Sequence, residues 1–100
     1  MKHAGATEIE NVVVEVGDGI APGARQYAHG RIAPLARYAP RPTPFAHVRL
    51  TTTGPRTISV HVNVDVDGTP VVGRAEAATF EEAVDAVRDQ LHHRLLKMHN

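Results

Sequence analysis

The strictest constraint in this sequence is an unbroken alternation of apolar and polar side chains over residues 57–66. A period of two is the spacing of a β-strand that buries one face and exposes the other, and a helix cannot satisfy it. The Asp67-Gly68 pair that follows is the preferred pair for a tight type I′ hairpin turn. A further strand-like run, residues 69–77, comes directly after it. The sequence therefore predicts an antiparallel hairpin with one buried face.

Two more strands are predicted upstream of this hairpin. The β-branched run at residues 9–16 ends at a Gly-Asp-Gly group, and residues 45–53 alternate again between apolar and polar side chains. Glycine and proline are adjacent in residues 54–56, which predicts a turn. We expect this turn to place Thr53 opposite Thr57, so that residues 45–53 pair with the hairpin.

The first predicted helix lies between the two upstream strands. It has an apolar stripe over residues 24–39, with Pro22 as an early helix residue. Pro34 lacks the N–H that an α-helix needs, and its ring would clash with the carbonyl of Gly30. A kink or break is therefore expected between Gly30 and Pro34. Residues 40–44 contain three prolines and are expected to form an extended linker.

The second predicted helix begins with a capping box, in which Thr79 is the N-cap and Glu82 follows three residues later. The element order is β-α-β-β-β-α, an α+β fold with a four-stranded mixed sheet and both helices on one face. Residues 9–100 are expected to form this single domain, and residues 1–8 a flexible N-terminal tail. Seven side chains are expected to share the core: Leu50, Val60, Val62, Val64, Val87, Leu91 and Leu95.

The hairpin turn fixes the register of the sheet and therefore its outer face. A two-residue loop places His61 opposite Arg74, and the pairing expected at the upstream turn places Arg49 opposite His61. These three side chains would form a row across the sheet, and we expect no carboxylate to interrupt it before Glu76 and Asp65. Two interpretations are open at this point: a solvated sheet face, or a patch that contacts phosphates.

The composition excludes several kinds of chemistry. Cysteine is absent, which rules out disulfides, thiolate metal sites and cysteine nucleophiles. The single serine, Ser59, has no nucleophile elbow around it, and the glycines at residues 17–19 lack the rest of a nucleotide-binding motif. Adjacent helical residues such as His92 and His93 point about 100° apart and cannot share one metal ion. We expect a protein that is not an enzyme and that uses no cofactor, metal or small-molecule substrate.

The charge balance restricts the choice of partner. Eleven basic residues offset eleven acidic ones, and seven histidines add positive charge on mild acidification. A nucleic-acid partner would therefore require the basic groups to gather on one face. No apolar stretch approaches the ~20 residues that cross a bilayer, and the N-terminus has no signal-peptide pattern. A cytoplasmic protein without membrane association is expected.

Five segments carry a family resemblance through their order and spacing. They are Arg-Gln-Tyr-Ala at 25–28, Arg-Ile-Ala-Pro-Leu-Ala-Arg-Tyr at 31–38, Val-Arg-Leu-Thr at 48–51, Asn-Val-Asp-Val-Asp-Gly-Thr-Pro-Val at 63–71, and the second helix from Ala83 to Lys97. With this pattern the chain resembles the N-terminal domain of the ribosome hibernation-promoting factors, also called ribosome-associated inhibitors or sigma-54 modulation proteins. Within that family it looks closest to the dormancy-linked factors of actinobacteria.

The resemblance implies a fold similar to double-stranded-RNA-binding domains and a role in ribosome hibernation. Such a domain binds 16S rRNA of the small ribosomal subunit, at the mRNA channel and the A- and P-site tRNA positions, and inhibits translation in dormant or stressed cells. Longer family members carry a C-terminal domain that pairs two ribosomes, so a homodimer is expected only through such a region, absent from this chain. The candidate RNA-binding residues are Arg31, Arg37, Arg49, Arg74 and Lys97 from the resemblance, His61 from the row, and Arg94 for its charge.

A function of another class is also open. The chain could be a non-catalytic protein-interaction or dimerisation module that pairs with a second chain through a sheet edge or the outer face. The two functions differ in salt response, because RNA binding weakens steeply as salt rises and an apolar protein interface does not.

Overall fold

The predicted hairpin is present in the computed structural model, which describes residues 7–99. β3 spans Thr57–Val66 and β4 spans Thr69–Ala77, and the two pair antiparallel in the predicted register. The φ angles of Asp67 and Gly68 are 51° and 91°. Both are positive, as a type I′ turn requires, so the predicted turn is confirmed.

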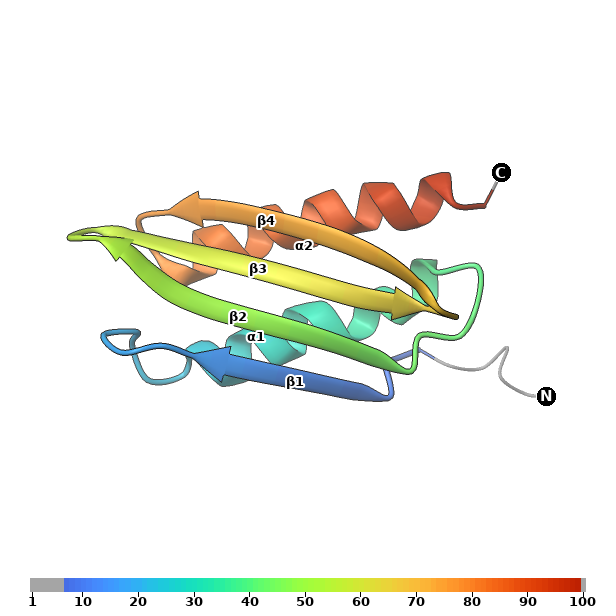
Figure 1. Ribbon diagram of the computed structural model, residues 1–100, viewed down its shortest axis with the longest axis horizontal. Helices are drawn as coiled ribbons and strands as arrows, with labels where there is room; N and C mark the ends of the chain where they lie inside the picture. Colours follow the sequence, from blue (N-terminus) through green and yellow to red (C-terminus); the bar gives the residue numbers. More distant parts are fainter. Residues whose placement is uncertain (1–6, 100) are drawn as a thin grey trace.

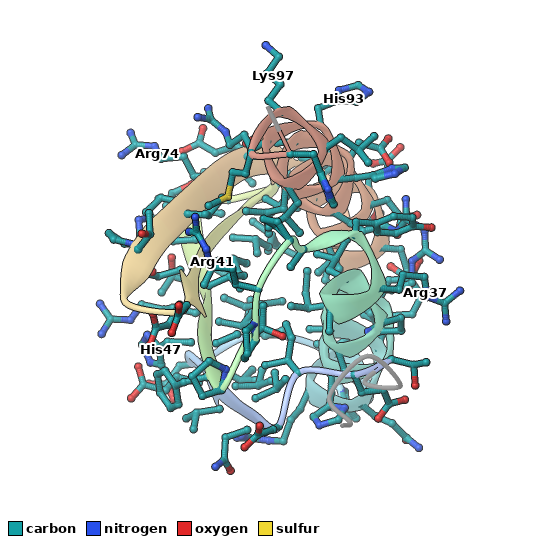
Figure 2. The ribbon with its side chains drawn as sticks, turned by 90° about the vertical axis from the view of Figure 1, so that its right-hand side faces the viewer. Arg37, Arg41, His47, Arg74, His93 and Lys97 are labelled. Atoms are coloured by element: carbon teal, nitrogen blue, oxygen red, sulfur yellow. The ribbon has the colours of Figure 1, made fainter. Side chains whose placement is uncertain are left out.

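The remaining elements complete the predicted β-α-β-β-β-α order. The strand order is β1-β2-β3-β4, with β1 parallel to β2 and the other pairs antiparallel, which confirms the mixed sheet. Figure 1 shows the two helices running along one face of the sheet, and Figure 2 shows the same two layers end on. The other elements are β1 (Asn11–Val16), α1 (Ala24–Ile32), the 3₁₀-helix η2 (Ala33–Tyr38), β2 (Phe45–Gly54) and α2 (Phe80–Lys97).

The first helix is shorter than its apolar stripe and changes type near its middle. Pro22 lies outside it, contrary to the prediction, because Gly23 is the N-cap and adopts a left-handed conformation with φ of 92°. The α-helix ends at Ile32 and the chain continues as η2, which carries Pro34 in its first turn. A proline without an N–H fits the start of a new 3₁₀ segment and not the interior of an α-helix. The break predicted between Gly30 and Pro34 is confirmed.

The pairing of β2 with β3 contains a bulge that the sequence does not reveal. Thr52 pairs with Ile58, but the next pair is Gly54 with Thr57, which leaves Thr53 unmatched. The expected pairing of Thr53 with Thr57 is therefore wrong. A two-residue turn closes on Gly54, and the extra residue is taken up as a bulge, so the rest of the strand keeps the predicted register.

Ile9 anchors the chain to the helix layer just before β1. Its side chain is buried, and its N–H donates to the carbonyl oxygen of Ala33 at 2.9 Å. Thr7 and Glu8 before it are exposed. The rest of the predicted N-terminal tail, residues 1–6, lies outside the described residues.

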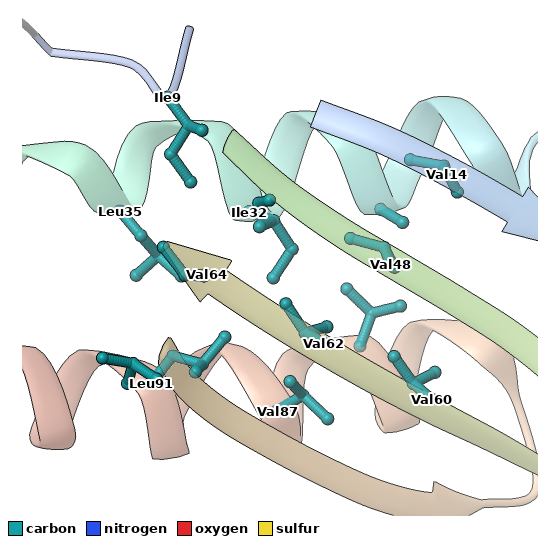
Figure 3. Packing of buried hydrophobic residues seen from close by; sticks show 14 of the residues in the cluster. Ile9, Val14, Ile32, Leu35, Val48, Val60, Val62, Val64, Val87 and Leu91 are labelled. Carbon is teal, nitrogen blue, oxygen red and sulfur yellow. The ribbon is translucent and has the colours of Figure 1, made fainter. Parts of the chain in front are cut away.

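The predicted core is confirmed, because all seven of its side chains are fully buried between the sheet and the helices (Figure 3). Ile32 from α1 and Leu35 from η2 join the same cluster. The contact between α2 and β4 depends on Gly73. A Cβ atom at this position would lie 3.3 Å from both Leu91 Cγ and Val87 Cγ1, so glycine allows the helix to approach the strand closely.

Each free edge of the sheet is capped by a helix side chain. On β4, the side-chain amide of Gln90 accepts from the N–H of Arg74 at 3.0 Å and donates to its carbonyl oxygen at 2.8 Å. Pro70 on the same strand has no N–H to offer. On β1, the guanidinium of Arg25 donates to the carbonyl oxygen of Val14. These contacts occupy backbone groups that an added strand would need.

Candidate RNA-binding surface

Three of the predicted residues form the expected row across the outer face of the sheet. β2 pairs Arg49 with His61, and β3 pairs His61 with Arg74, so the three side chains stand level on adjacent strands. All three are exposed. In Figure 2, Arg74 and His47 lie on the sheet side of the molecule, and Arg37 lies on the helix side. We call Arg49, His61 and Arg74 the basic row.

The basic row ends at a carboxylate, because the parallel pairing of β1 with β2 sets Glu15 beside Arg49. Glu15 Oε1 accepts hydrogen bonds from Arg49 Nε and Nη2, both at 3.3 Å, and lies 3.1 Å from His47 Nε2. The hydrogen bonds from Arg49 and the charge of His47 hold the pKa of Glu15 below its ordinary value. No carboxylate stands among the three residues of the row, as expected, but Glu15 adjoins its Arg49 end. The sequence does not reveal this neighbour, because no local turn sets the register of a parallel strand.

The outer face is hollowed on both sides of His61. One hollow has a volume of about 430 Å³ and the other about 400 Å³. Because His61 borders both, the basic row stands between two concavities where a ligand can reach it. The first is lined by Ser59, His61, Arg74, Ala75 and Glu76, and the second by Phe45, His47, His61, Asn63, Asp65, Gly68 and Pro70.

The basic end of α2 adjoins the β4 edge of the sheet. Arg94 and Lys97 are both exposed in the last turns of the helix. Arg94 borders a hollow of about 250 Å³ that residues 69–72 of β4 and Met98 also line. Lys97 projects outward from the end of α2 in Figure 2. These two cations therefore extend the charged surface around the β4 edge, beyond the outer face itself.

Arg31 and Arg37 lie in the helix layer, away from the basic row. Arg31 Nε is 3.0 Å from Asp85 Oδ1, in an ion pair that joins α1 to α2. The same carboxylate oxygen accepts the hydroxyl proton of Tyr27 at 2.8 Å, and this hydrogen bond raises the pKa of Tyr27 above its ordinary value. Arg31 thus has a structural partner within the domain, whereas the exposed Arg37 faces solvent from η2.

Three exposed apolar side chains on the outer face were not singled out by the sequence, and one of them is Val72 of β4, which is 37% exposed. Val13 is 43% exposed on β1, and Phe45 is 42% exposed on β2. The alternation that directs His47 and Arg49 outward also directs Phe45 outward. Strand alternation therefore predicts that Phe45 lies on the outer face.

Two further observations concern the part of the chain from residue 7 to residue 99. No three His, Asp or Glu side chains in this part come together as a metal ion would require. None of its helices combines the length and apolar character needed to cross a membrane.

Two solved structures of other proteins are similar to this chain in fold. The crystal structure of the Thermus thermophilus Protein Y N-terminal domain is similar with a TM-score of 0.72 at 23% identity, covering 91% of this chain and 98% of that one. A ribosomal subunit interface protein from Coxiella burnetii is similar with a TM-score of 0.72 at 20% identity, covering 89% and 97%. At these identities the likeness shows a shared fold. No curated protein sequence matches the chain.

Family membership comes from the sequence itself. The family model described as Sigma 54 modulation protein / S30EA ribosomal protein matches residues 12–100, which is nearly the whole chain. The resemblance seen in its five segments is confirmed at the level of the family. The chain belongs to the Sigma 54 modulation protein / S30EA ribosomal protein family, which is a non-catalytic family.

Proposed function

We propose that this chain is a ribosome hibernation factor domain, formed by residues 9–100, that binds 16S rRNA of the small ribosomal subunit in the cytoplasm. Bound at the mRNA channel and the A- and P-site tRNA positions, it inhibits translation in dormant or stressed cells. Family membership supports this proposal, as does the likeness of its fold to a protein described as a ribosomal subunit interface protein. The resemblance to the dormancy-linked factors of actinobacteria supports the physiological setting.

The observation that carries the proposal is the basic row on the outer face of the sheet. The chain has no net charge, so a general attraction to RNA is not available to it. The register nevertheless brings Arg49, His61 and Arg74 together on one exposed face, and Arg94 and Lys97 continue the positive surface past the β4 edge. Phosphate contacts from such a group supply affinity that does not depend on base sequence.

The alternative function, a protein-interaction module, requires an edge or face that accepts a second chain. The capped edges argue against strand addition, because Gln90 and Arg25 already hold backbone groups of β4 and β1. A homodimer through a C-terminal region of the kind that longer family members carry is a separate part of the proposal.

Cosedimentation with purified small ribosomal subunits at several salt concentrations tests the proposal. The paired reversals Arg49→Glu with Arg74→Glu, and separately Arg94→Glu with Lys97→Glu, should each weaken binding. Each lost phosphate contact should also reduce the slope of log affinity against log salt by about one unit. Reversal of Arg37 tests whether the helix layer contributes as well.

A charge-matched control separates position from net charge. Arg41→Glu with Arg56→Glu removes the same amount of charge from exposed positions outside the predicted set. This control should bind much better than either paired reversal. Unchanged cosedimentation of both paired reversals at moderate salt would remove the basis for RNA binding and favour the protein-interaction module.

Substitution tests His61 separately. His61 stands between Arg49 and Arg74 on the exposed face, where its ring N–H can donate to a phosphate. His61→Ala should therefore weaken binding to small subunits. Unchanged binding by this variant would exclude His61 from the contact surface.

A further inference from the structure

The outer face of the sheet has two halves of different chemistry. The basic row crosses one half. The second half consists of the next two rows of paired residues, and it carries an aromatic ring, an amide and apolar side chains. Successive outward positions on one strand lie about 7 Å apart, so the row of His47 adjoins the basic row and the row of Phe45 lies one position further away. The row next to the basic row contains Val13, His47, Asn63 and Val72. The row beyond it contains Asn11, Phe45, Asp65 and Pro70.

Phe45 is the unusual member of this second half. Its neighbours Ala46 and Val48 are fully buried, whereas 42% of the Phe45 surface is exposed on the opposite face. The core therefore does not explain the aromatic ring at this position. Phe45 instead lines the hollow of about 400 Å³ on the outer face, together with His47 and Asn63.

The groups around this hollow match those that recognise a nucleobase. Proteins that bind unpaired RNA stack the bases on exposed aromatic rings and read their edges with side-chain hydrogen bonds. The exposed amide of Asn63 offers both a donor and an acceptor. The Asp65 carboxylate accepts the N–H of Gly68 at 2.7 Å, so it is held toward the hairpin turn.

We propose that this hollow binds one unstacked base of RNA. Phe45 is the stacking platform, the Asn63 amide bonds the edge of the base, and Arg49 and Arg74 of the neighbouring row contact the adjoining phosphates. The inference rests on the proposed function, because it assigns a base subsite to the surface that contacts rRNA. It adds a contribution to affinity that does not depend on salt.

An apolar protein segment is the other occupant to consider, and the pattern of the face disfavours it. A protein contact of this kind uses a contiguous apolar patch. Here His47 and Asn63 separate the exposed Val13 from the exposed Val72 on the same level of the sheet. The hollow beside the Phe45 ring also borders His61 of the basic row, so an aromatic side chain and cationic groups lie at one concavity, as they do where RNA binds.

The chain contains no tryptophan, so one substitution provides a specific reporter. Phe45→Trp keeps an aromatic platform, and cosedimentation over a range of concentrations measures its affinity for small ribosomal subunits. Its fluorescence should be quenched on stacking, both by small subunits and by single-stranded RNA oligonucleotides. Val72→Trp, also exposed on the outer face, is the matched control and should show much less quenching.

Affinity gives the second readout. Phe45→Leu keeps an apolar side chain but removes the planar ring, so binding to small subunits should fall roughly 5- to 100-fold with an unchanged salt slope. An apolar protein contact would instead tolerate Phe45→Leu and be weakened by Val72→Ala. Phe45 lies outside the core, and circular dichroism with thermal melting verifies that each variant is folded.

The outcomes separate this inference from the proposed function. Cosedimentation of Phe45→Trp without quenching, or full affinity of Phe45→Leu, overturns the base subsite and leaves ribosome binding in place. Quenching by oligonucleotides without any cosedimentation supports the base subsite and overturns ribosome binding. Absence of both overturns both.

Discussion

The carboxylate of Glu15 on β1 accepts two hydrogen bonds from the guanidinium of Arg49 on β2, each 3.3 Å long. The partner of this arginine in the free protein is therefore an anion of the same domain. An incoming phosphate competes with that carboxylate for the same donors. Under the proposed function, this contact links RNA binding at the outer face to a residue outside the basic row.

Replacing Glu15 with glutamine should strengthen binding to small ribosomal subunits. The substitution removes a negative charge beside Arg49 and His47 while keeping the shape of the side chain. Because the pair is exposed, the gain should be modest, roughly two- to five-fold at low salt and smaller at high salt. Equal or weaker binding by Glu15→Gln would show that Glu15 orients Arg49 for RNA and does not compete with it.

The Glu15 contact should also appear in the acid dependence of stability. The pKa of Glu15 is lowered in the folded chain by Arg49 and His47, so the carboxylate stabilises the fold above its unfolded pKa. This contribution is lost as pH falls through the lower, folded pKa. Thermal melting of the unaltered chain and of Glu15→Gln should therefore differ slightly at neutral pH and converge in acid. A difference in melting temperature that does not change with pH would contradict this account.

Truncation of the core should be costly on both layers. Val62 and Leu91 are fully buried in one cluster, so Val62→Ala or Leu91→Ala should lower the free energy of unfolding by roughly 2 to 4 kcal/mol. Chemical denaturation measures this value. Val72→Ala on the outer face is the control and should change it by less than about 0.5 kcal/mol.

The cap of α2 should contribute a smaller and separable amount. Thr79 Oγ1 accepts the N–H of Glu82 at 3.2 Å and lies 3.3 Å from the Glu82 carboxylate, to which the hydroxyl donates. Thr79→Ala removes the acceptor and should cost about 1 kcal/mol of stability. Thr79→Ser retains the hydroxyl and should restore most of it. Equal melting temperatures for Thr79→Ala and the unaltered chain would argue against the cap.

The sequence predicts the hairpin and basic row because short, local chemistry determines them. The Asp67-Gly68 turn sets which residue faces which, and strand parity then directs Arg74 and His61 outward. The core follows from the same periodicities, since a residue on the wrong face would be left unpacked. These features need no knowledge of how distant segments meet.

The contacts that the sequence does not predict are those between distant segments. Glu15 reaches Arg49 only because a crossover brings β1 beside β2, and Arg31 pairs with Asp85, which lies 54 residues further along the chain. The bulge at Thr53 is local, but the chain could place the extra residue in either the turn or the strand. For Phe45, strand alternation predicts the outward position but not the exposed fraction of the side chain. That fraction depends on the neighbouring strands.

The capped sheet edges bear on what happens when many copies of this chain meet at high concentration. Cross-β fibres grow when an open strand edge templates the next chain. Gln90 on β4 and Arg25 on β1 hold backbone groups at the two edges, and Pro70 removes a donor from one of them. Gln90 and Arg25, which join the helices to the sheet, should thus also hinder fibre growth from the two edges.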